Sequence, residues 1–232
     1  MTKAYKHLFF DLDHTLWDFE KNSEETLVHL YDYYRLKELG VHSPDRLVET
    51  YRRINHHLWD LYNRGLIEKQ VLREKRFTDA LLELGVEETK MPQGMWELYL
   101  QICPTKTNLF PGALEMLEYL SGKYQLSVIT NGFEETQGRK LHHSGIAPYF
   151  KYLLTSEKAG YQKPRPEIFT MLLEMNRATC TETIMIGDNF EADICGAAAA
   201  GLDHVYFNPE KTEHKYDIQT EIHSLYQLKD IL

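Results

Sequence analysis

The segment Asp11-Leu12-Asp13 places two carboxylates directly after an apolar run, and these acids are the clearest candidates for chemistry in the chain. The run Leu8-Phe9-Phe10 before them predicts a buried strand. Residues i and i+2 of a strand point to the same face, so an extended path through Asp13 turns both carboxylates toward one spot. Such a pair indicates a divalent cation, a nucleophile with an acid/base partner, or both. Taken alone, the segment fits a strand followed by a polar turn equally well.

Three more polar clusters follow predicted strands. Thr130-Asn131-Gly132 comes after a β-rich run at 126–129, Lys163 lies in the loop beyond a short strand at 152–154, and Asp188 and Asp193 follow a buried run at 183–186. Parallel strands bring their carboxyl ends to one edge of a sheet, where ligands bind in open α/β folds. The four clusters are therefore expected to converge there.

A site of this composition suits phosphoryl transfer, which needs a nucleophile, charge neutralisation and positioning. A carboxylate can attack phosphorus, and Mg²⁺ takes oxygen ligands from one or two carboxylates together with phosphate and water. Thr130 offers a hydroxyl, and the amides of Asn131 and Gly132 are expected to point at phosphate oxygens at the start of a helix. Lys163 is expected to be a mobile cation, held in place by Pro164.

The pattern of apolar residues predicts the elements that position these groups. Strands are expected at 7–11, 126–129, 152–154, 183–186 and 205–207, and from residue 110 onward they alternate with helices. Between about 22 and 102 only helices are expected. This order predicts a doubly wound, Rossmann-like parallel α/β core formed by residues 1–16 and 106–232, with an all-helical cap inserted at 17–105.

Signals at the ends of several helices are also readable. Asn22 or Ser23 is expected to cap the first helix of the insertion, and Ser43-Pro44 is typical of the start of the second. A helix of small residues containing Gly196 is expected to end at Gly201, and the tail from about Ser224 is expected to be helical.

Composition limits the class of protein. The 232 residues are 43% hydrophobic and 26% charged, an ordinary composition for a soluble globular protein. The formal net charge of −9 argues against binding a nucleic acid polymer but does not exclude a small anionic substrate. No apolar run reaches the length of a membrane span and no signal peptide is recognisable, so we expect a cytoplasmic protein without a membrane partner. The odd number of cysteines, without metal-ligand spacing, agrees with reduced thiols. The sequence does not indicate the oligomeric state.

Taken together, Asp11-Leu-Asp13-His-Thr15, Thr130-Asn-Gly132, Lys163-Pro164 and Gly187-Asp188 with Asp193 resemble the four motifs of the haloacid dehalogenase-like (HAD) superfamily. Their order and spacing fit over the whole chain. The best-known form of the first motif has Gly where this chain has His14, a position that varies in nucleotidase-like members. The resemblance implies a doubly wound core with the helical insertion as a cap.

The resemblance also implies a role for each motif residue. Asp11 would be the nucleophile, and Asp13 would protonate the leaving oxygen and then activate water. Thr130 and Lys163 would hold the phosphoryl group. Mg²⁺ would be bound by Asp11, Asp188 and the backbone carbonyl of Asp13. Asp193 would contact the metal ligands or a water molecule bound to the metal. Dehalogenases of the superfamily lack the second acid, so the presence of Asp13 favours a phosphatase.

The segment 58–67, with Leu72 and Arg76-Phe77, resembles the cap of the YjjG/YfnB-type pyrimidine 5′-nucleotidases. The segments 129–133 and 186–189 also resemble the sequences of these enzymes. This resemblance implies a nucleoside monophosphate, including non-canonical pyrimidines, as substrate. A different phosphate ester such as phosphoglycolate or a sugar phosphate, or phosphoryl transfer in a mutase, would use the same chemistry. A catalytically idle protein that binds a phosphorylated ligand is a third hypothesis, and the intact set of Asp11, Asp13, Lys163 and Asp188 argues against it.

Four side chains of the predicted cap are candidates for contact with the substrate: Trp17, Trp59, Tyr62 and Arg76. Trp17 is the first choice because it lies at the entrance to the insertion, close to the catalytic acids in sequence. Aromatic residues at helical spacing are more often part of a core, and an arginine on such a helix is by default a surface residue, so a structural role stays the alternative for each.

Overall fold

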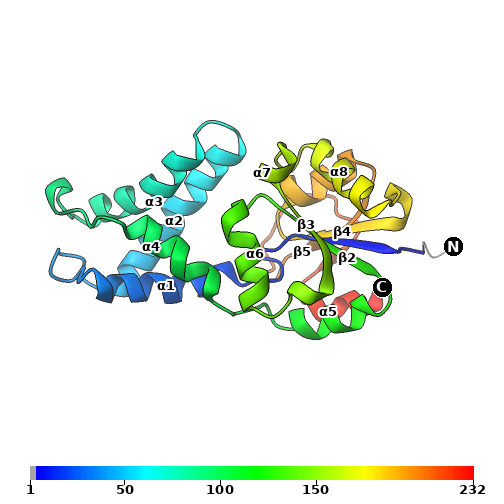
Figure 1. Cartoon of the computed structure of the whole chain (residues 1–232), viewed down its shortest axis with the longest axis horizontal. Coiled ribbons are helices and arrows are strands. Elements are labelled where there is room, and N and C mark those ends of the chain that lie inside the picture. The colour runs from blue at the N-terminus through cyan, green and yellow to red at the C-terminus, as the bar shows by residue number, and fades with distance from the viewer. Residues whose placement is uncertain (1–3) are drawn as a thin grey trace. The chain divides into compact units, whose positions relative to one another are not determined.

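The computed structural model describes residues 4–232 and divides them into two compact units. The first unit contains the residues up to Asp18 together with Thr107–Leu232, and the second is the segment Phe19–Lys106 (Figure 1). Trp17 therefore belongs to the first unit, two residues before the second begins at Phe19.

The first unit is built on a six-stranded sheet in the order β3-β2-β1-β4-β5-β6, and every neighbouring pair is parallel. Its strands are β1 (His7–Phe10), β2 (Gln125–Thr130), β3 (Phe150–Thr155), β4 (Thr183–Gly187), β5 (Asp203–Phe207) and β6 (Glu221–Ile222). The chain moves outward from β1 in one direction to β3 and then in the other direction to β6. This order confirms the predicted doubly wound α/β core, and β1 lies at its switch point.

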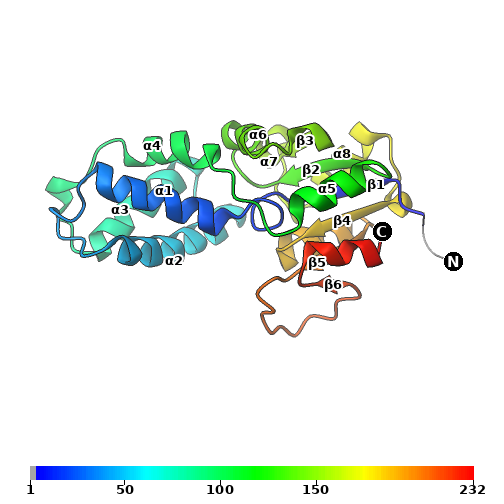
Figure 2. The same ribbon diagram turned by 90° about the horizontal axis from the view of Figure 1, so that it is seen from below.

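Helices cover both faces of this sheet, as Figures 1 and 2 show. Because both faces are covered, the strands are apolar on both sides rather than alternating. The helices of the first unit are α5 (Ala113–Ser121), α6 (Glu134–His143), α7 (Ser156–Ala159), α8 (Pro166–Asn176) and α9 (Gly196–Ala199), and a π-helical turn at Phe190–Cys195 runs into α9.

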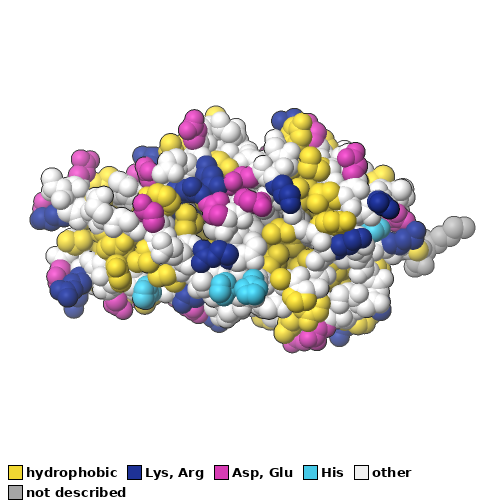
Figure 3. Space-filling view, viewed as in Figure 1, with side chains coloured by type: hydrophobic (Ala, Val, Ile, Leu, Met, Phe, Trp, Pro, Cys, Tyr) yellow, Lys and Arg dark blue, Asp and Glu magenta, His cyan; other side chains and the backbone are white. Residues whose placement is uncertain are grey.

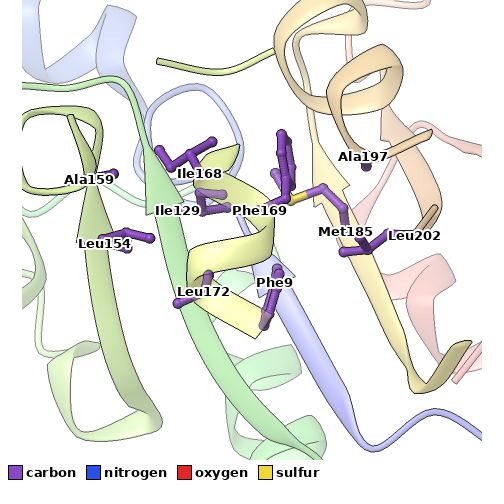
Figure 4. Close-up of a cluster of buried hydrophobic side chains, with 10 residues drawn as sticks. All are labelled: Phe9, Ile129, Leu154, Ala159, Ile168, Phe169, Leu172, Met185, Ala197 and Leu202. Carbon is purple, nitrogen blue, oxygen red and sulfur yellow. The ribbon is translucent and has the colours of Figure 1, made fainter. Parts of the chain in front are cut away.

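One apolar cluster fixes the central strands to the helices of one face (Figure 4). Phe9 of β1, Ile129 of β2 and Met185 of β4 are all fully buried and contribute to it from neighbouring strands. From α8, Phe169 and Leu172 complete the cluster. Burying side chains of this size contributes about 1.5–3 kcal/mol each, so the cluster holds the strand ends at fixed positions.

Strand pairing aligns the residues that end the three central strands. Phe10 is the partner of Val128 in β2 and of Ile186 in β4. The amide of Asp11 donates to the carbonyl of Ile186, 3.0 Å away. Asp11 therefore leaves the sheet at the same edge as Thr130 and Gly187.

The second unit consists of four helices: α1 (Phe19–Tyr33), α2 (Pro44–Asn63), α3 (Lys69–Glu83) and α4 (Met95–Ile102). The predicted start of α2 is confirmed, because the amide of Arg46 donates to the side chain of Ser43. The predicted cap of α1 is wrong, because this helix begins at Phe19. Asn22 and Ser23 lie inside it and are buried, and Ser23 accepts a hydrogen bond from Tyr99 of α4.

Arg76 is buried in the centre of the helical unit, with only 2% of its surface exposed, so the expectation of a surface residue is wrong. Its guanidinium carbon lies 4.9 Å from the ring centre of Tyr99, 5.3 Å from that of Phe77 and 6.0 Å from that of Tyr51. Nη1 donates to Asn55 at 3.4 Å. These contacts give Arg76 a packing role through cation–π attraction.

The structure differs from the sequence prediction most at the carboxyl-terminal end. The expected small-residue helix is a π-helical turn followed by a single α-helical turn that ends at Ala199. Strand β6 was not expected, and the expected tail helix is a 3₁₀ turn at Leu225–Asp230. Two residues give no measurable periodicity, which is why β6 leaves no pattern in the sequence.

No helix among residues 4–232 combines the length and the low polarity that crossing a bilayer requires. On the face drawn in Figure 3, basic and acidic side chains are interspersed. The expectation that the chain does not bind a nucleic acid polymer stays a prediction.

Candidate active site

Lys163 lies at the centre of the polar residues at the sheet edge. Its Nζ is 2.6 Å from Oδ1 of Asp11, 2.6 Å from Oδ1 of Asp193 and 3.0 Å from the carbonyl oxygen of Ile129. Only 3% of its surface is exposed. The expectation of a mobile cation is therefore wrong, because two carboxylates and a carbonyl hold the ammonium group in a buried position.

The backbone of Lys163 is held by the side chain of Asn131, across the sheet edge from it. Asn131 accepts the amide of Lys163 at 2.8 Å and donates to its carbonyl at 2.9 Å. The Lys163–Pro164 peptide is cis. Asn131 thus connects the loop after β2 to the loop that carries the lysine, a role that the sequence did not indicate.

Three carboxylates gather around this lysine. One oxygen each of Asp11, Asp188 and Asp193 lies within 4.8 Å of the others. The hydroxyl of Thr15 donates to Asp188 at 2.9 Å. Asp193 uses both of its oxygens on protein donors, since Oδ1 pairs with Lys163 and Oδ2 accepts the amide of Asn189 at 3.0 Å.

Asp193 reaches this position because Gly187, at the end of β4, has no side chain. A Cβ atom at Gly187 would lie 2.3 Å from Oδ2 of Asp193 and 2.5 Å from its Cγ. Asp193 is fully buried and stands on the π-helical turn, a form of helix that is frequent at functional sites. The glycine before Asp188 is therefore required for space.

Burial dominates the electrostatics of the cluster. It raises the pKa of Asp11 well above its usual value, although Lys163 opposes the effect. Burial, together with the charge of Asp193, raises the pKa of Asp188 to about 7. Burial would lower the pKa of Lys163, but Asp11 and Asp193 outweigh it and raise the pKa. The single ammonium thus faces three carboxylates, and the excess negative charge suits a hard divalent cation with oxygen ligands.

Asp13 lies outside this cluster and has partners of its own. Nζ of Lys140 is 2.6 Å from its Oδ1 and 2.8 Å from its Oδ2, and Nε2 of Gln137 is 3.2 Å from Oδ2. The two acids of the first motif therefore pair with different lysines. Neither Gln137 nor Lys140 was expected at the site, although their spacing of three residues on a helix was a usable signal.

The loop that carries Asp13 turns sharply at His14. The backbone of His14 has a φ of +64°, in the left-handed region that favours glycine. The amide of His14 donates to the carbonyl of Trp17 at 3.0 Å, and the amide of Trp17 donates to the carbonyl of Leu12 at 2.9 Å. This geometry accounts for the glycine that the related motif has at this position.

The loop after β2 closes on Thr130. The amide of Gly132 donates to Oγ1 of Thr130 at 3.0 Å, and helix α6 begins two residues later at Glu134. Thr130 is 1% exposed and lies one strand away from Asp11. The expectation that these groups bind phosphate stays a prediction.

The predicted substrate contacts occupy three different environments. Trp17 is fully buried in the first unit, and its ring centre lies 4.5 Å from Nζ of Lys140. Trp59 and Tyr62 of α2 are half-buried, and their ring centres lie 5.6 Å apart. Arg76 is enclosed within the helical unit, as described above. Of these four residues, only Trp59 and Tyr62 are partly exposed to solvent.

A family model described as haloacid dehalogenase-like hydrolase matches residues 5–201 of the chain. The pyrimidine 5′-nucleotidase PynA of Streptococcus pneumoniae is 33% identical, over 98% of this chain and 95% of the relative. The pyrimidine 5′-nucleotidase YjjG of Escherichia coli is 30% identical, over 97% of this chain and 96% of the relative. Among solved structures, the magnesium-bound HAD-hydrolase YfnB of Bacillus subtilis is 30% identical, covers 99% of both chains and has a TM-score of 0.87.

Proposed function

This chain belongs to the haloacid dehalogenase-like hydrolases and is a phosphatase of that family, and we propose that it is a magnesium-dependent 5′-nucleotidase for pyrimidine nucleoside monophosphates. The similarity to two pyrimidine 5′-nucleotidases over nearly the whole chain, helical unit included, carries the choice of substrate. The buried pair of Asp11 and Lys163, with the half-buried Asp188 beside it, supports the chemistry. The product of each turnover would be a nucleoside and inorganic phosphate.

In the proposed first step, a carboxylate oxygen of Asp11 attacks phosphorus while the bond between phosphorus and the ester oxygen breaks. Asp13 gives its proton to that departing oxygen, so that the nucleoside leaves as a neutral alcohol. Lys163, 2.6 Å from Asp11, offsets the negative charge that the phosphoryl group brings to the buried carboxylate. An aspartyl-phosphate on Asp11 results.

In the proposed second step, water attacks the phosphorus of this aspartyl-phosphate. Asp13, now ionised, takes a proton from the water, and the bond between phosphorus and the Asp11 oxygen breaks. Inorganic phosphate leaves and both acids return to their starting forms. Thr130 and the amides that follow it would hold the phosphoryl oxygens in both steps.

The residues present fit a magnesium ion. Asp11 and Asp193 are buried, Asp188 is half-buried, and one oxygen of each lies within 4.8 Å of the others. Each oxygen of Asp193 already accepts a hydrogen bond from the protein, so we propose that Asp11 and Asp188 supply the carboxylate ligands. We propose that the backbone carbonyl of Asp13 is the third protein ligand. When bound, Mg²⁺ would supply positive charge to the phosphoryl oxygens. The proposal agrees with the magnesium-bound relative.

The proposed function is tested by assaying purified protein with p-nitrophenyl phosphate and with a panel of phosphate monoesters, in Mg²⁺ and in EDTA. The panel contains uridine, deoxyuridine and thymidine monophosphates, purine nucleotides, phosphoglycolate and sugar phosphates. We expect Mg²⁺-dependent turnover with the highest kcat/KM on pyrimidine nucleotides. A preference for a sugar phosphate would contradict the proposed substrate, and full turnover in EDTA would contradict the metal.

Magnesium should stabilise the protein more at pH 8 than at pH 5. The pKa of Asp188 is about 7 in the metal-free fold, against 3.8 in an unfolded chain, so the folded state binds more protons between these values. The stability of the metal-free protein therefore falls as pH rises from about 4 to 7. The cation competes with these protons for the same carboxylates, so its binding strengthens as they ionise.

The measurement is the free energy of unfolding with EDTA and with Mg²⁺ at both pH values. Asp188→Asn is the matched control, because the amide keeps the size of the side chain and removes its charge. We expect this variant to be more stable than the metal-free wild type at pH 8, by up to about 4 kcal/mol, and to gain no stability from Mg²⁺. An equal gain in both proteins would remove Asp188 from the metal site.

Trp59→Ala should change the choice of substrate more than the chemistry. We propose that Trp59 and Tyr62 select the nucleoside, whose base would stack on an aromatic ring. Stacking of a base on an aromatic side chain contributes about 1–3 kcal/mol, so kcat/KM for uridine 5′-monophosphate should fall about tenfold. Activity on p-nitrophenyl phosphate should fall much less, because this small ester makes few such contacts.

Trp96→Ala is the control for the tryptophan variant, since Trp96 is also half-buried in the helical unit. It should leave the ratio of the two kcat/KM values unchanged. A Trp59→Ala variant that loses activity equally on both esters would show that this ring has a structural role. Tyr62→Phe and Tyr62→Ala would then be measured in the same way.

A further inference from the structure

Asp13 accepts hydrogen bonds from two side chains of one helix. Lys140 binds both of its oxygens, at 2.6 and 2.8 Å, and Gln137 donates to Oδ2 at 3.2 Å. Both stand on α6, three residues apart and on the same face of the helix. We propose that Gln137 and Lys140 are positioning residues that hold the Asp13 carboxylate in its reactive orientation. The inference rests on the proposed function, in which Asp13 is the acid and base.

The orientation of the Gln137 amide supports this role. Gln137 is 1% exposed, and its Oε1 accepts no hydrogen bond from any described residue. A buried polar atom without a partner costs about 1–3 kcal/mol. Turning the amide over would place Oε1 against the Asp13 carboxylate and lose the donor. The side chain therefore keeps the orientation that serves Asp13 and leaves its other end unsatisfied.

Gly132 provides the space that this contact needs. A Cβ atom at Gly132 would lie 1.8 Å from Nε2 of Gln137, 2.5 Å from its Cδ and 3.2 Å from Oδ2 of Asp13. The backbone of Gly132 is not in the left-handed region, so the glycine is required for space and not for its conformation. The last residue of Thr130-Asn131-Gly132 thus acts on Asp13 through Gln137.

Trp17 supports the second contact. Its ring lies beneath Nζ of Lys140 at 4.5 Å, and its backbone forms a bridge with Asp13. Lys140 is 5% exposed, so cation–π attraction acts there in a largely desolvated place. Trp17 therefore helps fix Lys140 from inside the first unit, an assignment different from the predicted contact with substrate.

Esters with different leaving groups isolate the placement of Asp13. The oxygen of an alkyl ester needs the proton from Asp13 as its bond to phosphorus breaks, whereas 2,4-dinitrophenolate leaves without one. The value of kcat/KM covers the steps up to departure of the leaving group, so a misplaced acid lowers it for the alkyl ester and spares the dinitrophenyl ester. A general defect of folding or phosphate binding lowers both.

The test measures kcat/KM for uridine 5′-monophosphate, glycerol 2-phosphate and 2,4-dinitrophenyl phosphate. Asp13→Asn sets the scale, with an expected loss of about 10²–10⁴-fold on the alkyl esters and less than about tenfold on the dinitrophenyl ester. Gln137→Met and Lys140→Met should lose about 10–100-fold on the alkyl esters and less than about threefold on the other. Lys140→Arg should recover part of the loss, and Lys158→Met, an exposed lysine of α7, should change neither value.

Equal losses on both kinds of ester, or no loss, in Gln137→Met and Lys140→Met would overturn the positioning role if Asp13→Asn still separates the esters. If Asp13→Asn itself fails to separate them, the acid role of Asp13 in the proposed function is wrong, and the positioning role falls with it. The reference variant therefore tells the two failures apart.

A double-mutant cycle tests Gly132 independently. Gly132→Ala should displace the Gln137 amide and reproduce the loss of Gln137→Ala on the alkyl esters. In the double variant the main clash is gone and only the contact with Asp13 remains, so its kcat/KM should stay within about threefold of Gln137→Ala. Losses that multiply would show that Gly132 acts without Gln137 and would overturn this part of the inference.

Discussion

Asp11→Asn is expected to abolish both turnover and the phosphorylated enzyme. An amide oxygen is a poor nucleophile, so no aspartyl-phosphate can form at this position, and kcat should fall by at least about 10⁴-fold, as in other enzymes that lose their nucleophile. Asp11 lies at the end of the central strand, 2.6 Å from Lys163, and Asn fills the same volume without the charge. The fold should persist, because Lys163 keeps its pair with Asp193.

The measurement is acid quenching during turnover of a ³²P-labelled substrate, followed by counting of the label bound to protein. Asp13→Asn is the informative comparison, since it removes the base of the second step and leaves the nucleophile. With 2,4-dinitrophenyl phosphate, whose leaving group needs no proton, Asp13→Asn should accumulate labelled protein while Asp11→Asn gives none. Wild-type turnover in Asp11→Asn would place the nucleophile elsewhere.

The position of these acids was predictable because it follows from strand order. A buried apolar run that ends in polar residues marks the carboxyl end of a parallel strand, and the sheet then brings Asp11, Thr130 and Asp188 to one edge. This inference depends only on the order of the strands and does not require knowledge of any contact between side chains. The family motifs agree with it because they lie at the same strand ends.

The partners of these acids were harder to predict, because they are set by packing between distant segments. The environment of Lys163 depends on Asp11 and Asp193, 152 and 30 residues away, so its burial left no local signal. Gln137 and Lys140 did have a signal, since a polar pair at helical spacing follows the Thr130 loop directly. The pattern shows which face of the helix they share but not that Asp13 lies against it.

Burial of Arg76 could also have been inferred. Leu72, Arg76 and Ala80 are four residues apart and share one face of α3, and both apolar members are buried. The charge of arginine suggested the surface, yet the aromatic rings of three helices enclose it. Helical periodicity was the better guide here than residue type.

Lys163→Met is the second variant for which we expect a large effect, because it removes the only ammonium group that the described residues place within the carboxylate cluster. Asp11 and Asp193 would be left buried without a cation, and breaking a buried ion pair in this way costs about 3–5 kcal/mol. Loss of charge stabilisation at the phosphoryl group should also lower kcat/KM by at least about 10³-fold.

The loss of stability should depend on pH. Without Lys163 the pKa values of the remaining carboxyl groups rise further, so the folded state holds protons that the unfolded chain releases, and stability rises as pH falls from 8 to 5.5. Urea unfolding in EDTA at pH 8 and pH 5.5 measures this difference. Lys158→Met, which removes an exposed lysine, should change stability by less than about 0.5 kcal/mol at either pH.

A double variant separates the structural effect of Lys163 from its effect on the reaction. Lys163→Met with Asp193→Asn removes one uncompensated carboxylate, so much of the lost stability should return at pH 8. Activity should not return, because no ammonium group then faces Asp11 or the phosphoryl group. If activity recovers together with stability, Lys163 acts only by keeping the cluster folded, and the charge that assists phosphoryl transfer must come from the metal alone.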